Sequence, residues 1–260
     1  MKVPKIPSLN KVKTYFKKNG LNFILKNINL EEKNILDKRF SKKVYSPDIR
    51  DLYRLHKLII DNKRTKALEY GTGWSSLVIY HALKYNQKKY KKNPFPRIKN
   101  PYSLTIVDND KKFLKISKKR IDSFFKKKTN ISFHFSKNNM TTFNDRITSE
   151  FINHPQINPD FIYLDGPDQF KISGRINNLT IATFDFMPMS SDILKYENFL
   201  TPGTIIVIDG RTVNARFLKN NFQRKWKYFY DFKNDQSFFY LNEDPLGKLN
   251  KTQLQFYKKK

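Results

Sequence analysis

The feature that most constrains the fold is a glycine-containing segment at residues 68–76, Leu-Glu-Tyr-Gly-Thr-Gly-Trp-Ser-Ser. Apolar residues predict a strand at 66–70 before the glycines, and the pattern after them predicts a helix at 75–83. Gly71 and Gly73 allow a tight turn and let the backbone come close to a ligand, while the helix start presents free N–H groups. A glycine turn between a strand and a helix is typical of α/β domains that bind a ligand at that turn.

Short apolar runs alternate with helical stretches along the rest of the chain. Further strands are predicted at 104–107, 131–135, 160–164 and 204–208, and helices at 111–125 and 214–222. This alternation predicts a largely parallel sheet with helices on both faces. Two aromatic-rich segments, 226–231 and 237–241, follow the last helix and predict an antiparallel hairpin at one edge of the sheet.

The chain is predicted to divide into an N-terminal helical cap, residues 1–63, and a sheet domain, residues 64–260. In the cap, Ser46 and Pro47 indicate the start of an amphipathic helix that ends near Asn62, with the Ser46 hydroxyl as its cap. The segments 88–102 and 169–189 are longer than ordinary connections and are predicted to be insertions.

Carboxylates stand at the ends of three predicted strands. Asp108 ends the second strand, Asp165 the fourth and Asp209 the fifth. Parallel strands end at one edge of a sheet, and folds of this kind bind ligands there. In nucleotide-binding sheets, a carboxylate after the second strand accepts hydrogen bonds from two ribose hydroxyls. Asp110 is better placed than Asp108 to cap the following helix, which leaves Asp108 for a ligand.

The order of these motifs resembles that of the class I S-adenosylmethionine-dependent methyltransferases. The resemblance covers roughly residues 64–242 and implies a Rossmann-like seven-stranded sheet, mostly parallel, with an antiparallel terminal hairpin and helices on both faces. It rests on Glu69-x-Gly71-x-Gly73, on Asp108, on Asp-Phe-Ile-Tyr-Leu-Asp-Gly-Pro at 160–167, and on Leu-Thr-Pro-Gly-Thr at 200–204.

A Rossmann dehydrogenase is the competing fold. Glu69 before the first glycine and Pro-Gly before the fifth strand favour the methyltransferase. Ser75 also stands where the dinucleotide fingerprint has its third glycine.

The resemblance implies S-adenosyl-L-methionine as the cofactor. Glu69 is then expected to organise the loop or to receive the methionine ammonium group. Gly71 and Gly73 border the methionine and ribose, and Asp108 binds the ribose hydroxyls. The other expected cofactor contacts are Trp74, Ser75 and Asp165.

The adenine contact is expected after the third strand, within residues 136–140. No acidic residue stands there, and the candidates are Asn138 and Met140.

Asp165, Asp168 and Asp209 are the candidate general bases for a methyl acceptor. Two carboxylates at neighbouring strand ends also suit a divalent cation. Metal-dependent O-methyltransferases resemble this arrangement, but asparagine follows their second aspartate, whereas Gly210 follows Asp209 here. No metal site is therefore predicted. An ion pair between Asp209 and Arg211 is the alternative to a catalytic role.

The composition is basic, with 51 Lys plus Arg against 23 Asp plus Glu, a net charge of +28 and no cysteine. The absence of cysteine excludes disulfides, zinc–thiolate sites and a catalytic thiol. None of the four histidines stands three or four residues from another, which argues against a histidine metal site. Most of the basic residues are Lys, and the abundant Asn, Ile, Phe and Tyr indicate an AT-rich codon bias.

The acceptor is expected to be a small molecule or saccharide that offers an oxygen or a nitrogen. The alternative is a basic nucleic-acid-binding protein, or an RNA methyltransferase, on the same fold. No Asn-Pro-Pro-Tyr-like base-flipping motif is present. Neither the first twenty residues nor the longest aliphatic run, 205–208, resembles a signal peptide or membrane span, so a cytoplasmic protein is expected.

Overall fold

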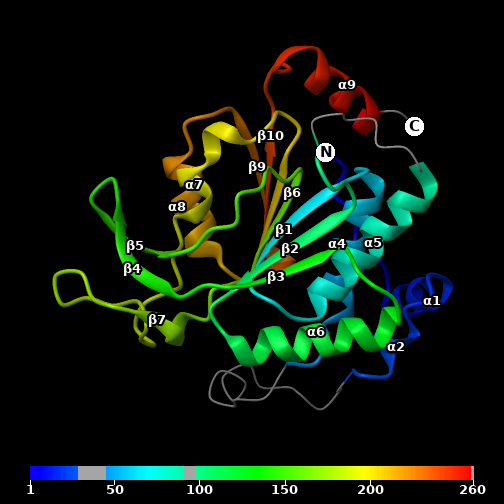
Figure 1. The fold of residues 1–260 in the computed structure, drawn as a ribbon, viewed down its shortest axis with the longest axis horizontal. Coiled ribbons are helices and arrows are strands. Elements are labelled where there is room, and N and C mark those ends of the chain that lie inside the picture. Colours follow the sequence, from blue (N-terminus) through cyan, green and yellow to red (C-terminus); the bar gives the residue numbers. More distant parts are fainter. Residues whose placement is uncertain (29–44, 91–97, 259–260) are drawn as a thin grey trace.

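A seven-stranded sheet forms the centre of the computed structural model, which describes residues 1–28, 45–90 and 98–258 (Figure 1). The strand order is β3-β2-β1-β6-β8-β10-β9. The first five strands in this order are parallel, and β10 runs antiparallel to both of its neighbours. The strands are β1 (Lys66–Tyr70), β2 (Ser103–Asp108), β3 (Ile131–Phe135), β6 (Phe161–Leu164), β8 (Ile205–Asp209), β9 (Trp226–Asp231) and β10 (Gln236–Leu241).

Helices cover both faces of this sheet (Figure 1). On one face, α4 (Ile49–Asp61), α5 (Trp74–Tyr90) and α6 (Lys111–Phe125) bury apolar residues such as Leu55, Ile79 and Leu114 against it. On the other face lie α7 (Asp192–Lys195) and α8 (Thr212–Asn221), which bury Ile193, Ala215 and Leu218. The predicted three-layer α/β architecture is therefore confirmed.

The N-terminal helices share a core with the sheet domain. Phe16 from α1 (Leu9–Lys18) and Ile24 from α2 (Asn22–Leu25) pack in one cluster with Leu77 of α5 and Ile121 of α6. The described part of residues 1–63 thus adds a further helical layer over α5 and α6. The domain boundary at 63 stays a prediction.

A second, three-stranded sheet was not predicted. It consists of β4 (Asn138–Phe143), β5 (Arg146–Phe151) and β7 (Ile172–Ser173), in the order β5-β4-β7. Asn144 and Asp145 form the turn between β4 and β5, with φ of 47° and 59°. Two residues with positive φ are what a type I′ hairpin turn requires, and Asn and Asp tolerate that conformation. Strand β7 of this sheet belongs to the start of the predicted insertion at 169–189.

Most predicted element bounds are confirmed within a few residues, with two corrections near the site. Helix α5 continues to Tyr90, beyond the predicted end at 83. Helix α4 begins at Ile49, and its cap is Asp48 rather than Ser46: the Asp48 carboxylate accepts from Arg50 N at 2.9 Å and Asp51 N at 3.4 Å.

The C-terminal helix α9 (Gly247–Lys258) was not predicted either. It packs at the start of β6, where the Tyr257 hydroxyl donates to Asp160 Oδ2 at 2.7 Å. In the described ranges, no helix has the length and apolar character needed to cross a membrane. Residues 91–97 of the predicted insertion at 88–102 lie outside the described residues.

Candidate active site

The strand register brings the predicted site residues to one edge of the sheet. Tyr70 is level with Val107 of β2 and with Leu164 of β6, and Leu164 is level with Ile208 of β8. The residues that follow are the glycine turn, Asp108, Asp165 and Asp209. They therefore lie at neighbouring carboxyl ends, as the sequence predicted.

The glycine turn touches the segment after β6 through backbone atoms. Gly71 has φ of 90°, and a Cβ on it would lie 2.8 Å from Gly166 N. A Cβ on Gly166 would in turn lie 2.4 Å from Gly71 N. Gly73 is different, because the nearest atom to a Cβ there is Ser75 Oγ at 3.7 Å. Gly71 is thus required for loop packing, whereas the Gly73 side of the turn is open for the approach of a ligand.

Glu69 supports the turn from beneath. Its side chain is fully buried, and Ser75 Oγ donates to its Oε1 at 2.5 Å. Its Oε2 is enclosed and has no hydrogen-bond partner among the described residues. Burial raises the pKa of Glu69 to about 8, although the serine hydrogen bonds act in the opposite direction. Glu69 is therefore largely protonated near neutral pH.

Asp108 keeps one carboxylate oxygen available. Its Oδ1 accepts from Asp110 N at 2.7 Å, and no described residue donates to the other oxygen. Burial raises the pKa of Asp108 to about 7. Asp110 caps α6, accepting from Lys112 N at 2.7 Å and Phe113 N at 3.2 Å, so the predicted division of roles between the two aspartates is confirmed for the cap.

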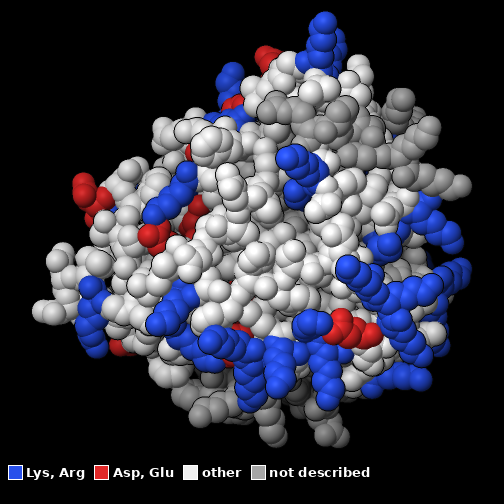
Figure 2. All heavy atoms as spheres, viewed as in Figure 1, with Lys and Arg blue, Asp and Glu red and all other residues white. Residues whose placement is uncertain are grey.

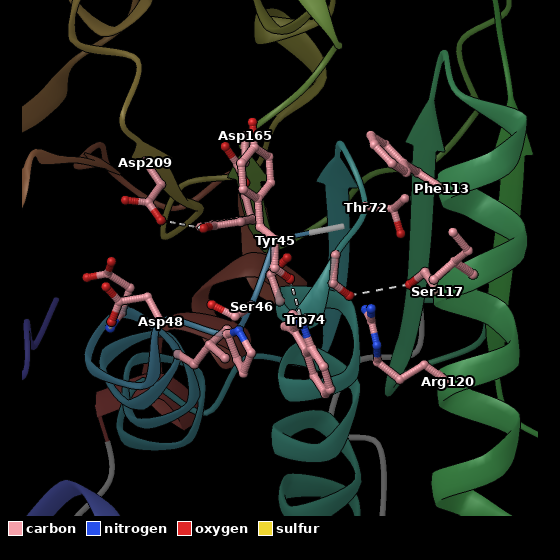
Figure 3. A pocket seen from close by; sticks show the side chains of 17 residues that line it. Tyr45, Ser46, Asp48, Thr72, Trp74, Phe113, Ser117, Arg120, Asp165 and Asp209 are labelled. Carbon is pink, nitrogen blue, oxygen red and sulfur yellow. Dashed lines mark hydrogen bonds between the residues drawn. The ribbon is translucent and has the colours of Figure 1, made fainter. Parts of the chain in front are cut away.

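A cavity of about 180 Å³, here called the candidate pocket, opens beside the glycine turn (Figure 3). Five of the predicted residues line it: Gly73, Trp74, Ser75, Asp165 and Asp209. The lining does not include Glu69, Gly71 or Asp108, which neighbour lining residues along the chain or on an adjacent strand. A larger hollow of about 900 Å³ lies around Lys66 and Asp160, where β1 and β6 begin, away from these residues.

Residues of the N-terminal segment and of α6 complete the lining. They were not predicted, because their approach to the pocket depends on how the helices pack on the sheet. The segment before α4 closes over the pocket, and Trp74 Nε1 donates to Tyr45 O at 3.1 Å (Figure 3). The additional lining residues include Tyr45, Ser46, Asp48, Asp51, Phe113, Ser117 and Arg120.

One end of the candidate pocket holds three interacting carboxylates. Asp209 accepts from the Tyr163 hydroxyl at 2.6 Å, whereas the carboxylates of Asp165 and Asp51 have no hydrogen-bond partner among the described residues. Desolvation by the pocket walls, and next the proximity of Asp209, raises the pKa of Asp51 to about 8 and that of Asp165 to about 7, although the Asp165 side chain still faces solvent. Burial also raises the pKa of Asp209 itself. The cluster can therefore take up a proton near neutral pH.

Two further charged residues near this edge, Asp168 and Arg211, make contacts with the backbone, and a catalytic role for Asp168 stays a prediction. Asp168 does not line the candidate pocket: it caps a short turn, and its side chain accepts from Phe170 N at 3.0 Å. The alternative considered for Asp209, an ion pair with Arg211, is not found among the described residues, because Arg211 Nη2 donates to the backbone oxygens of Asp165 at 2.9 Å and Pro167 at 2.7 Å. Arg211 thus holds the loop after β6 in place.

Asn138 lies away from the candidate pocket, at the start of β4. It is fully buried, and neither of its amide atoms has a hydrogen-bond partner among the described residues. Its role as an adenine contact stays a prediction.

The folded chain brings two histidines together that are far apart in sequence. His56 of α4 and His81 of α5 hydrogen-bond at 2.9 Å, and the Tyr15 hydroxyl contacts His56 at 2.6 Å. Burial lowers the pKa of both histidines, that of His81 to about 4. In the part of the chain that the structure describes, no group of three or more His, Cys, Asp or Glu side chains is arranged to hold a metal ion.

No protein-family model matches the chain, and no curated protein matches it. Among solved structures, one match is the O-methyltransferase from Bacillus cereus in complex with SAH, at 11% identity and a TM-score of 0.40, covering 92% of this chain and 93% of that one. Another is the SAH-bound methyltransferase PaMTH1 from Podospora anserina, at 11% identity and a TM-score of 0.49, covering 92% and 99%.

The fold is assigned from the sheet of the chain itself. Five parallel strands in the order β3-β2-β1-β6-β8 are extended by the antiparallel pair β10 and β9, with helices on both faces. The glycine turn follows β1, as the sequence resemblance implies. The chain therefore has the Rossmann-like fold of the class I S-adenosylmethionine-dependent methyltransferases.

Proposed function

We propose that this protein is an S-adenosylmethionine-dependent methyltransferase whose acceptor is a small molecule or saccharide with an oxygen or nitrogen to be methylated. The observation that carries the proposal is the convergence at one sheet edge of the glycine turn, the ribose-type carboxylate Asp108, and a pocket that holds Asp165 and Asp209. The enclosure of that pocket by the start of α4 and by α6 favours an acceptor of small size.

The residues present fit the cofactor. The unpaired oxygen of Asp108 is available for ribose hydroxyls, and the open side of Gly73 allows close approach of the methionine part. The enclosed Oε2 of Glu69 lacks a partner near the same turn. When bound, the cofactor supplies a methyl group on a sulfonium, and the chain mainly binds and orients the two reactants.

The carboxylate cluster supports proton removal from the acceptor. A general base works best when its pKa lies near the operating pH, and the pKa of Asp165 is raised to about 7. Asp165 lines the candidate pocket, and Tyr163 holds Asp209 in a fixed orientation. Asp165 is therefore the preferred base, with Asp209 and Asp51 as its electrostatic partners. Asp168, which caps a turn, is assigned a supporting role for the loop.

Calorimetric titration of the chain with S-adenosylhomocysteine tests the proposal. We expect micromolar binding by the wild type and a loss of about tenfold or more in Asp108→Asn, because a charged hydrogen-bond acceptor for the ribose is lost. Asn keeps the size of the side chain and can still accept from Asp110 N.

The matched control is Asp110→Asn, two residues along the chain, because an asparagine cap retains α6 while the same charge is removed. Its affinity should stay close to that of the wild type. If the folded wild type does not bind S-adenosylhomocysteine, the proposed function is wrong.

A further inference from the structure

Arg120 brings a positive charge to the candidate pocket, and none of the described residues supplies a counterion for it. It lies on the inner side of α6, and its guanidinium stacks over the Trp74 ring with 3.9 Å to the ring centroid. No hydrogen bond or ion pair joins this guanidinium to any residue in the described ranges. Burial lowers the pKa of Arg120 to about 10. A partly buried cation without a partner favours the binding of an anion.

The N-terminus of α5 reinforces this preference. The helix has 17 residues and starts at Trp74, directly beneath the Arg120 guanidinium, and its first turn contains no acidic residue. The free N–H groups and the helix dipole of such a terminus attract negative charge. Ser46, Thr72 and Ser117 add hydroxyl groups to the lining nearby.

The two ends of the candidate pocket differ in charge, because Arg120 is a cation whereas the carboxylates at the other end become negative as the pH rises through about 7 to 8. Figure 3 shows Arg120 and Trp74 at one end and Asp165 and Asp209 at the other. An anionic group would be repelled by the carboxylate end and attracted by the Arg120 end. A ligand that fills the pocket is therefore oriented with its negative group against Arg120.

We propose that Arg120, stacked on Trp74 at the start of α5, is a specificity-determining residue that receives a carboxylate or phosphate group of a bound ligand. The inference rests on the proposed function and deepens it. Two sources supply this chemistry: the methionine carboxylate of the cofactor, or an anionic group on the acceptor. A planar guanidinium binds either group through paired N–H donors.

The first test compares S-adenosylhomocysteine with its decarboxylated analogue, S-adenosyl-3-thiopropylamine, by calorimetry. If Arg120 binds the cofactor carboxylate, the wild type binds S-adenosylhomocysteine about tenfold or more tightly than the analogue. Arg120→Gln then binds both ligands equally, and Arg120→Lys restores part of the preference. Lys119→Gln, an exposed site on the same helix, is the charge-matched control and keeps the wild-type preference.

The second test needs no cofactor and uses inorganic phosphate as the probe. The chain has two tryptophans, so Trp226→Phe leaves Trp74 as a fluorescent reporter beside Arg120. We expect phosphate to change the Trp74 fluorescence, and Arg120→Gln in this background to abolish the change. If saturating S-adenosylhomocysteine blocks the response, its carboxylate occupies the site; if the response persists, the site is assigned to the acceptor.

The two proposals fail in different ways. The wild type could bind no S-adenosylhomocysteine and still show the Arg120-dependent response to phosphate. This result would contradict the proposed methyltransferase function but would support an anion site at Arg120. The proposed role of Arg120 is wrong if Arg120→Gln has the same preference between the two ligands as the wild type and also gives the same fluorescence response to phosphate.

Discussion

Glu69 is a carboxyl group buried beneath the glycine turn. It is fully buried, its charged neighbours include the carboxylates of Asp165 and Asp108, and one of its oxygens has no partner among the described residues. A buried carboxyl group without a cation is more stable in its neutral form. The residue that organises the glycine turn therefore makes the stability of the fold depend on pH.

Replacement of Glu69 by Gln is expected to remove this dependence. Because the pKa is raised from 4.5 to about 8 in the folded chain, Glu69 contributes stability below about pH 4.5 and loses it as the pH rises through about 8. Gln does not titrate and has no such loss. Between about pH 5 and about pH 9, the free energy of unfolding of Glu69→Gln should therefore rise relative to that of the wild type by on the order of 2 kcal/mol or more. Urea unfolding at both pH values measures the gain.

Asp145→Asn, at an exposed hairpin turn, serves as the control for removing a carboxylate. If the stability difference between Glu69→Gln and the wild type does not change with pH, Glu69 is not a buried carboxyl group with a raised pKa.

At the scale of elements, Arg54 joins the N-terminal helix α4 to the terminal hairpin. Its Nη2 pairs with Asp231 Oδ2 of β9 at 2.5 Å, and its Nη1 donates to Gln236 Oε1 of β10 at 2.9 Å. Arg54 is only 5% exposed. Its removal would take away the donor to Gln236 Oε1 and the cation beside Asp231, to which Asn234 Nδ2 still donates at 2.8 Å. Segments from opposite ends of the chain are thus held together by one buried side chain.

Arg54→Ala is expected to lower the free energy of unfolding by about 1.5–3 kcal/mol, because it removes the charge-assisted hydrogen bonds to Asp231 and Gln236. Arg50→Ala, one turn earlier on the exposed side of α4, should change it by less than about 0.5 kcal/mol. Thermal or urea unfolding measures both. Equal effects of the two substitutions would contradict a structural role of the Arg54 contacts.

The elements of the central sheet were predictable because their sequences contain continuous apolar runs. Every residue of β6 is buried, and all but the last residue of β8. The β4–β5 hairpin is rich in Asn, Thr and Ser and lacks such a run, so it was missed. Helix α9 was missed for a related reason: the residues it buries, Asn250 and Gln253, are polar.

Some residues of the candidate site could be predicted from the sequence and others could not. Asp108, Asp165 and Asp209 were predictable because they stand at the carboxyl ends of buried strands, and the register of parallel strands brings such ends together. Asp51 and Arg120 were not, because they reach the pocket through the packing of α4 and α6. The one sequence signal for Arg120 is its spacing of seven residues from Phe113, which places it on the inner side of α6.

At the scale of the whole molecule, the charge of the surface and the charge of the site differ. Figure 2 shows a row of Lys and Arg side chains along the lower edge, over α6, whose exposed lysines are Lys111, Lys112, Lys115, Lys118 and Lys119. The lining of the candidate pocket instead holds four aspartates and one arginine. The net charge of +28 therefore does not describe the surface that a reactant meets in the pocket.

A crystal structure of the chain with S-adenosylhomocysteine would test cofactor binding at the glycine turn. We predict that the adenosylhomocysteine lies along the glycine turn, with its ribose hydroxyls about 2.7–3.1 Å from the free oxygen of Asp108 and its sulfur directed into the candidate pocket. A ligand bound elsewhere, or a ribose that does not contact Asp108, would contradict the proposed cofactor site.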